Sequence, residues 1–272
     1  MLKKVAAIHD LSGIGRCSLT VAIPILSALK VQCCPFPTAI LSSQTGFSEY
    51  SFLDLTNEMN KYKNVWNNLN IHFDCIYSGF LGSKDQVNIV SKFIDDNKDS
   101  LVIVDPVMGD DGDLYPIFDN EMCSKIKSLV QKSDIVTPNL TEALILIGEN
   151  LNNTNLDKSN LVRIAKQVSN LGPSKVVITG IKIKDYIYNL SFDKNLDEAY
   201  FTSSPFNNIS YSGTGDIFTS ILAGMILNGY SLKNSVIKAN NFISNVISYT
   251  SKFDTDRNDG VMFEMFLNEL TN

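Results

Sequence analysis

Cysteine, histidine and charged residues are all scarce in this 272-residue sequence. Its five Cys residues are odd in number, form no Cys-x-x-Cys pair and are accompanied by only two His residues. These counts argue against a disulfide framework and against a zinc site, so we expect reduced, mostly buried thiols. Charged residues make up 19% of the chain and hydrophobic residues 44%, which excludes an intrinsically disordered protein.

Long apolar runs and clusters of positive charge are missing as well. The longest strongly apolar stretch, Ile221 to Leu227, is far shorter than the roughly 20 residues that cross a bilayer. Only Val5 to Ile8 follow the two lysines near the start, too few apolar residues for a secretion signal, so we expect a cytoplasmic protein. The net charge of -6 argues against nucleic acid, because binding to phosphate backbones needs a surplus of Lys and Arg. We therefore expect a small-molecule partner, with no role for membranes or nucleic acids.

Short apolar runs alternate with amphipathic segments through the first half of the chain. The runs predict strands at 4–8, 75–78, 101–104 and 135–137. The segments that follow them have helical spacing, at 16–29, 83–95, 120–131 and 140–147. Continuous apolar strands separated by helices are typical of a parallel sheet that is covered on both faces.

The second half of the chain continues this pattern and then becomes helical. We predict a helix at 156–171, a buried strand at 175–179, antiparallel edge strands at 186–192 and 199–202, and helices at 216–227, 232–250 and 261–270. No repeat or linker interrupts the pattern, so residues 1–272 are predicted to form one doubly wound, mostly parallel α/β domain with helices on both faces. Ligands of such domains bind beyond the carboxyl ends of the strands.

The strongest local motif is Gly213-Thr214-Gly215-Asp216, which precedes an apolar helix. Two glycines allow a tight turn with free backbone amides, and the positive end of the helix dipole lies at the same place. This combination predicts an anion hole. Asp216 has two interpretations, because an acid at the start of a helix is also an ordinary N-cap.

Two further motifs follow predicted strands. Asp105 and Asp110 lie in a loop that Pro106 and Gly109 hold in shape, although a solvated acidic loop would look the same. Asn139 and Glu142 are three residues apart on one helical face, a spacing that suits Mg²⁺ and its waters. The alternative for this pair is a plain capping box.

Together these motifs resemble the ribokinase superfamily of small-molecule kinases. Four segments more narrowly resemble the pyridoxal and pyridoxamine kinases of its vitamin branch, namely Ser78 to Ser83, Val104 to Asp110, Thr137 to Asn139 and Gly172 to Thr179. The similarity runs from about residue 4 to about residue 265. It implies a ribokinase-like fold, ATP as co-substrate, Mg²⁺, a monovalent cation such as K⁺, and a homodimer.

The resemblance also implies roles for single residues. Asp216 would accept the proton of the substrate hydroxymethyl group, and the amides of Gly213, Thr214 and Gly215 would stabilise the phosphoryl group in transfer. The metal would lie near Asp105, Thr137, Asn139 and Glu142. The nucleotide would lie near Asp110, Asn139, Thr179 and Ser212. The monovalent cation would lie among Asp105, Thr137, Thr179 and Gly213.

A pyridine ring with a hydroxyl needs an acceptor or carboxylate, a hydroxyl donor and an aromatic face. Asp10, Ser12, Thr45 and Phe80 are the candidates for these contacts. Many members of the resembled family have Ser in place of Asp10 and Tyr in place of Phe80, so these two positions depart from the pattern. His9 is interpreted either as part of this site or as a loop histidine with ordinary hydrogen bonds.

The expected function is ATP-dependent phosphorylation of the 5'-hydroxymethyl group of a B6 vitamer, giving the 5'-phosphate and ADP. One alternative is the hydroxymethylpyrimidine (phosphate) kinase of thiamine synthesis, whose motifs overlap. That branch usually ends its anion hole in Gly-Cys, whereas this chain has Gly215-Asp216. A second alternative is a non-catalytic nucleotide-binding relative, which would have no use for a base.

Overall fold

The computed structural model describes residues 2–116, 118–151 and 154–271. Its main sheet has the strand order β11-β10-β9-β8-β5-β4-β1-β2-β3. These strands are β1 (Lys4–Ser12), β2 (Gln32–Leu41), β3 (Phe52–Asp54), β4 (Cys75–Ser78), β5 (Leu101–Val104), β8 (Ile135–Val136), β9 (Lys175–Ile183), β10 (Tyr186–Asp193) and β11 (Glu198–Pro205). A small hairpin, β6 (Gly109–Asp110) with β7 (Asp113–Leu114), stands apart from it.

The central strands are parallel, as predicted. Parallel pairing joins β2 to β1, β1 to β4, β4 to β5, β5 to β8 and β8 to β9. Antiparallel strands close both edges, with β10 and β11 at one and β3 at the other. The edge pair at β10 and β11 was predicted, whereas β2 and β3 were not among the predicted strands.

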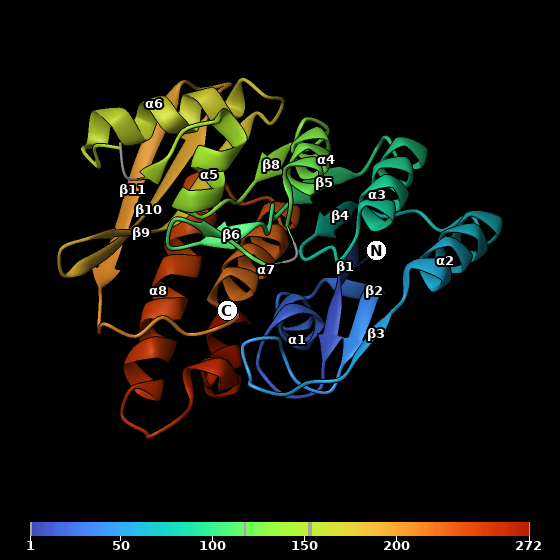
Figure 1. The fold of residues 1–272 in the computed structure, drawn as a ribbon, viewed down its shortest axis with the longest axis horizontal. Helices are drawn as coiled ribbons and strands as arrows, with labels where there is room; N and C mark the ends of the chain where they lie inside the picture. The colour runs from blue at the N-terminus through green and yellow to red at the C-terminus, as the bar shows by residue number, and fades with distance from the viewer. Residues whose placement is uncertain (1, 117, 152–153, 272) are drawn as a thin grey trace.

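Helices cover both faces of this sheet (Figure 1). They are α1 (Ser18–Ala28), α2 (Thr56–Asn68), α3 (Lys84–Asp96), α4 (Asn120–Val130), α5 (Leu140–Ile147), α6 (Lys158–Ser169), α7 (Thr214–Leu227) and α8 (Leu232–Thr250). Short 3₁₀ segments follow at η2 (Arg257–Asp259) and η3 (Phe263–Leu270), so the predicted helix at 261–270 is a 3₁₀ segment that begins later. None of the described helices is long and apolar enough to cross a membrane.

Strand β1 illustrates why the sheet needs cover on both faces. Val5 and Ala7 pack into the hydrophobic cluster made with α1, α7 and α8. Ala6 and Ile8 pack into the opposite cluster, which α3 to α6 complete. All four side chains are fully buried, because successive residues of a strand point to opposite faces. This two-sided burial confirms the predicted doubly wound α/β fold.

The end of β1 corrects one expectation. The polar segment from His9 was predicted to be a loop, but β1 continues to Ser12, which pairs with Leu41 of β2. The register shifts between His9 and Leu11, so Asp10 lies at an irregularity of the ladder. Parallel pairing with β2 therefore keeps this end of β1 in the sheet, and His9, Asp10 and Ser12 are buried there.

Candidate active site

The turn before α7 has a shape that requires glycine at residue 213. Gly213 is the N-cap of α7 and has a φ of 75°, in the left-handed region. A Cβ atom added there would lie 1.8 Å from the carbonyl oxygen of Arg16. Backbone conformation and space thus both exclude a larger residue. The helix then begins with a 3.0 Å hydrogen bond from the backbone amide of Ile217 to the carbonyl oxygen of Gly213.

Four successive backbone amides of this turn are free. Within the described part of the chain, the amides of Gly213, Thr214, Gly215 and Asp216 donate to no acceptor. They lie at the positive end of the 14-residue helix α7, where unpaired donors and the helix dipole together favour an anion. The arrangement is able to bind a phosphate group.

Asp216 is the third residue of α7 and does not cap its own helix. Its Oδ2 accepts a 2.8 Å hydrogen bond from the backbone amide of Ser18, at the start of α1. The simple N-cap interpretation is therefore wrong, because Gly213 occupies that position. Burial, opposed by the Ser18 hydrogen bond and reinforced by the charge of Asp10, raises the pKa of Asp216 to about 7. This carboxylate is consequently a far better proton acceptor than an exposed one.

Asp10 and Ser12 lie on the other side of Ser18. Asp10 is buried and accepts hydrogen bonds from the hydroxyls of Ser12, at 2.8 Å, and Ser18, at 2.5 Å. Burial raises the pKa of Asp10, and these two hydroxyls lower it. Ser18 has a φ of 51°, which is rare for a residue other than glycine. Sequence reasoning missed Ser18, because nothing local marks a serine that contacts two distant acids.

Asp105 follows β5 and lies close to the glycine turn. A Cβ on Gly215 would be 4.0 Å from its Oδ2. The side chain is buried, and no described group donates a hydrogen bond to its carboxylate. Burial, followed by the negative charges of Glu142 and Asp216, raises the pKa of Asp105 well above its usual range. A proton or a cation can neutralise a largely buried carboxyl group that has no protein donor.

Asn139 and Glu142 form a capping box at the start of α5, which was the alternative interpretation of this pair. The Asn139 side chain accepts from the Glu142 amide at 2.9 Å, and Glu142 accepts from the Asn139 amide at 2.8 Å. Glu142 also accepts from the Met108 amide at 3.0 Å, and Asn139 donates to the Gly109 carbonyl at 2.7 Å. The pair thus fixes the loop after β5, and burial raises the pKa of Glu142. Both residues retain unused oxygen lone pairs.

The remaining residues of the predicted nucleotide side lie on neighbouring elements. Thr137 follows β8 and accepts a 3.0 Å hydrogen bond from Thr219 of α7. Thr179 lies in β9, where its amide donates to the Pro138 carbonyl at 2.9 Å. Asp110 lies in β6 and accepts from the Asp111 amide at 2.9 Å. Over the described ranges, no three His, Cys, Asp or Glu side chains form a ready metal site.

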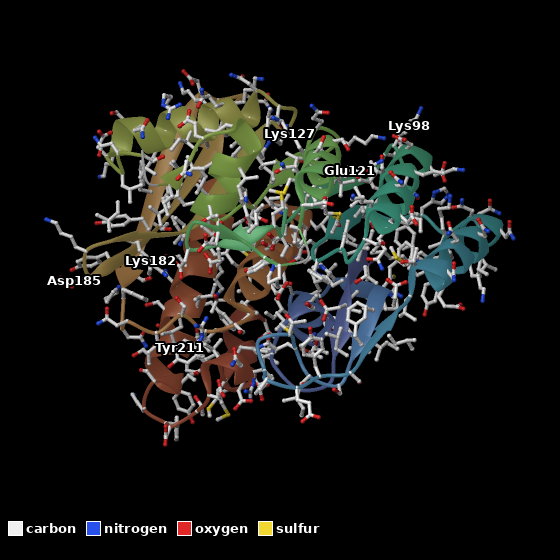
Figure 2. The ribbon with its side chains drawn as sticks, viewed as in Figure 1. Lys98, Glu121, Lys127, Lys182, Asp185 and Tyr211 are labelled. Atoms are coloured by element: carbon white, nitrogen blue, oxygen red, sulfur yellow. The ribbon has the colours of Figure 1, made fainter. Side chains whose placement is uncertain are left out.

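Ser212 connects the glycine turn to another loop. Its hydroxyl accepts a 3.2 Å hydrogen bond from Gln44, which also donates to the Asn258 carbonyl at 3.1 Å. Tyr211, labelled in Figure 2, is buried just before this turn. Gln44 thus anchors the loop after β2 beside α7. Sequence reasoning gave it no role, and a lone glutamine in a polar loop carries no signal.

Two candidate substrate residues lie further out. Thr45 is exposed in the loop after β2. Phe80 is half-buried after β4, where its ring packs at 6.5 Å from that of Phe118. None of the described contacts joins Thr45 or Phe80 to Asp10. The structure thus brings the acidic and glycine-turn residues together, and the described contacts do not join Thr45 or Phe80 to them.

Sequence comparison finds relatives along most of the chain. The profile of the family described as phosphomethylpyrimidine kinase matches residues 23–261. A hydroxymethylpyrimidine/phosphomethylpyrimidine kinase of Haemophilus influenzae is 29% identical over 176 residues. The aligned region covers 63% of this chain and 64% of that protein, so the chain spans less than two thirds of this relative's length.

Structure comparison finds close neighbours over the whole chain. A Bacteroides thetaiotaomicron protein, provisionally named a phosphomethylpyrimidine kinase and crystallised with pyridoxal, is 40% identical, with a TM-score of 0.96. The match covers 100% of this chain and 96% of that one. Pyridoxal kinase from Lactobacillus plantarum is 28% identical, with a TM-score of 0.91 and coverage of 99% and 97%. The pyridoxal kinases that its motifs resemble are among its structural neighbours, and the chain belongs to the phosphomethylpyrimidine kinase family.

Proposed function

We propose that this kinase transfers the terminal phosphoryl group of ATP to the 5'-hydroxymethyl group of pyridoxal, pyridoxamine or pyridoxine. The observation that carries the proposal is the turn at 213–216, where four unpaired amides adjoin the carboxylate of Asp216. Phosphoryl transfer needs donors for the charge on the moving group and an acceptor for the proton of the alcohol. This turn offers both within four residues.

Asp216 is the proposed base, and its task is mainly to position the alcohol. A carboxylate with a pKa of about 7 remains too weak to ionise an alcohol before reaction. Proton transfer is therefore late and follows bond formation to phosphorus. The amides of Gly213, Thr214 and Gly215 stabilise the charge that develops on the phosphoryl oxygens, and each well-aimed donor contributes roughly 3 kcal/mol.

The acidic cluster suits a cation bound together with the phosphates. Asp105 is buried without a protein donor, the charge of Glu142 acts on it, and Glu142 and Asn139 both have oxygen atoms to offer. Mg²⁺ commonly takes one or two carboxylates, several waters and substrate phosphates. We assign Asp105, Glu142, Asn139 and Thr137 to this ion. When bound, it would neutralise phosphate charge, and a monovalent cation would be held near Thr179 and Gly213.

The substrate side favours a B6 vitamer. The relative from Bacteroides thetaiotaomicron, 40% identical over this whole chain, crystallised with pyridoxal. Asp10 and Ser12 are buried polar residues that are joined to each other by a hydrogen bond. Ser18 links them to the proposed base, because its hydroxyl donates to Asp10 and its amide donates to Asp216. Thr45, in the loop after β2, and Phe80, after β4, remain the proposed contacts of the ring. The family description and the Haemophilus influenzae relative support hydroxymethylpyrimidine as the second candidate.

A coupled ATP-turnover assay with the three vitamers and hydroxymethylpyrimidine tests the proposal. We expect kcat/KM for at least one vitamer to exceed that for the pyrimidine by at least about tenfold. Turnover of the pyrimidine alone would identify the second candidate. ADP binding without turnover of any alcohol would indicate a non-catalytic relative. The cytoplasmic location and the homodimer stay proposals. Light scattering of the purified protein tests the homodimer.

A further inference from the structure

His9 is a buried histidine without hydrogen-bond partners. It lies in β1 with 0% of its surface exposed. Neither Nδ1 nor Nε2 forms a hydrogen bond in the described part of the protein. The interpretation of His9 as a loop histidine with ordinary hydrogen bonds is therefore wrong. Buried polar atoms are normally paired, and an exception calls for an explanation.

The neighbouring strand β4 fixes the position of the His9 ring. Tyr77 packs against it edge to face, with ring centroids 4.3 Å apart and planes at 76°. A Cβ on Gly79 would lie 2.3 Å from Nδ1 and 2.4 Å from Cε1. Any larger residue at position 79 would displace the imidazole. The end of β4 thus holds this ring closely in a single place.

The imidazole points at the proposed base. Nδ1 of His9 lies 3.8 Å from Oδ1 of Asp216, slightly beyond hydrogen-bond distance. Oδ2 of the same carboxylate is already occupied by the Ser18 amide. Oδ1 is consequently the oxygen that remains for the substrate alcohol, and its orientation depends on what else it contacts.

We propose that His9 is a positioning residue for Asp216: its neutral Nδ1–H form donates to Oδ1 once nucleotide and substrate are bound. The inference rests on the proposed function of Asp216 and assigns the second contact of its carboxylate. A shift of about 1 Å closes the gap between the two atoms. The carboxylate would then be held at both oxygens, leaving one lone pair of Oδ1 directed at the alcohol.

A neutral donor suits this acidic environment. The titratable groups around the pair are Asp10 of β1, Cys17 before α1, Tyr77 of β4, Asp105 after β5 and Tyr115 after β7. Burial lowers the pKa of His9 to about 3, so its ring stays neutral at physiological pH. A hydrogen bond donated to a carboxylate favours the ionised form. His9 would therefore keep Asp216 ionised at a lower pH than burial alone allows.

Two substitutions test this role by activity. His9→Phe keeps a planar ring and removes the N–H, whereas His9→Asn supplies an amide N–H near the Nδ1 position. For His9→Phe we expect the acidic limb of the kcat/KM profile to move up by about one pH unit. We also expect its kcat at pH 6 to fall about tenfold while KM for ATP stays within about threefold. His9→Asn should return the acidic limb most of the way to its original pH and restore most of the kcat at pH 6. An identical acidic limb in all three proteins would overturn the proposal.

Nitrogen-15 NMR of the unmodified protein tests the contact without relying on turnover. The chain has only two histidines, and His72 is exposed, so it provides an internal control. With ADP, Mg²⁺ and pyridoxal present, we expect His9 in the Nδ1–H form. Asp216→Asn should shift its Nδ1 signal and leave His72 unchanged. A His9 ring in the Nε2–H form would overturn the proposal. Failure of every alcohol in the assay would instead refute the proposed function, and the NMR result would still stand.

Discussion

The backbone amide of Ser18 donates a 2.8 Å hydrogen bond to Oδ2 of Asp216, joining residues 198 positions apart. Ser18 is the first residue of α1 and Asp216 the third of α7, so the bond connects two helix N-termini. The Ser18 hydroxyl meanwhile donates to Asp10. One serine, held at a φ of 51°, therefore orients two acids. Backbone strain of this kind is often found where a functional group must be held still.

This relationship makes Asp216→Asn an informative substitution. The amide oxygen of Asn can still accept from Ser18, so the local geometry should persist while the proton acceptor is lost. We expect kcat to fall by about 10² to 10⁴ and the ADP dissociation constant to stay within about threefold. Coupled turnover and calorimetry measure the two quantities. Asp185→Asn, on the exposed β9–β10 hairpin (Figure 2), is the control. Unchanged turnover in Asp216→Asn would mean that the base lies elsewhere.

Gly213→Ala tests the shape of the anion hole. The φ of Gly213 is 75° and that of Gly229 is 86°, so alanine is strained at both positions by about 1–2 kcal/mol. Only at Gly213 would the new Cβ collide with a neighbour, since nothing lies within 4 Å at Gly229.

We therefore expect Gly213→Ala to lower the unfolding temperature more than Gly229→Ala does, and to weaken ADP binding by at least about tenfold. Gly229→Ala should bind ADP like the unsubstituted protein. Denaturation curves and calorimetry measure these effects. Equal stability and equal ADP affinity in the two variants would show that the turn does not depend on the backbone position of Gly213.

The buried carboxyl groups make stability depend on pH. Burial raises the pKa of Asp216 to about 7 and also raises those of Asp105 and Glu142. Unfolded carboxyl groups titrate near pH 4, so the native state holds more protons above that value. This contribution is complete below the unfolded pKa and is lost as pH rises through the native pKa.

We expect the free energy of unfolding to fall between about pH 5.5 and pH 8 in the absence of ligands, with Asp216 alone contributing on the order of 2 kcal/mol. Urea titrations at the two pH values measure it. Asp216→Asn should reduce the fall, because it removes one of the groups that titrate. Stability that is constant or increases over this interval would contradict the burial of charged carboxylates in the apo protein.

The sequence predicted the parallel sheet and the glycine turn because both depend on local patterns. Apolar runs marked the buried strands, and the spacing of Asn139 and Glu142 allowed two interpretations, of which the structure shows the capping box. The surroundings of His9 and Asp10 could not be predicted from their polar neighbours, since the continued pairing of β1 with β2 and the packing of distant segments determine their burial. The Ser18 contact depends on the approach of two helices. That approach is a tertiary property without a local signature.

Asp105→Asn separates binding of a cation from structural stability. Asp105 is buried and accepts no hydrogen bond from the described residues, while Glu142 and Asp216 repel its charge. The neutral amide removes this repulsion, so the apo protein should unfold several degrees higher at about pH 8. The same change removes a proposed oxygen ligand, so the Mg²⁺ concentration for half-maximal turnover should rise at least about tenfold. Asp113→Asn, at an exposed position in β7, is the matched control. A less stable apo protein with unchanged Mg²⁺ demand would identify Asp105 as a structural acceptor, because only a carboxylate that the fold itself needs would behave in that way.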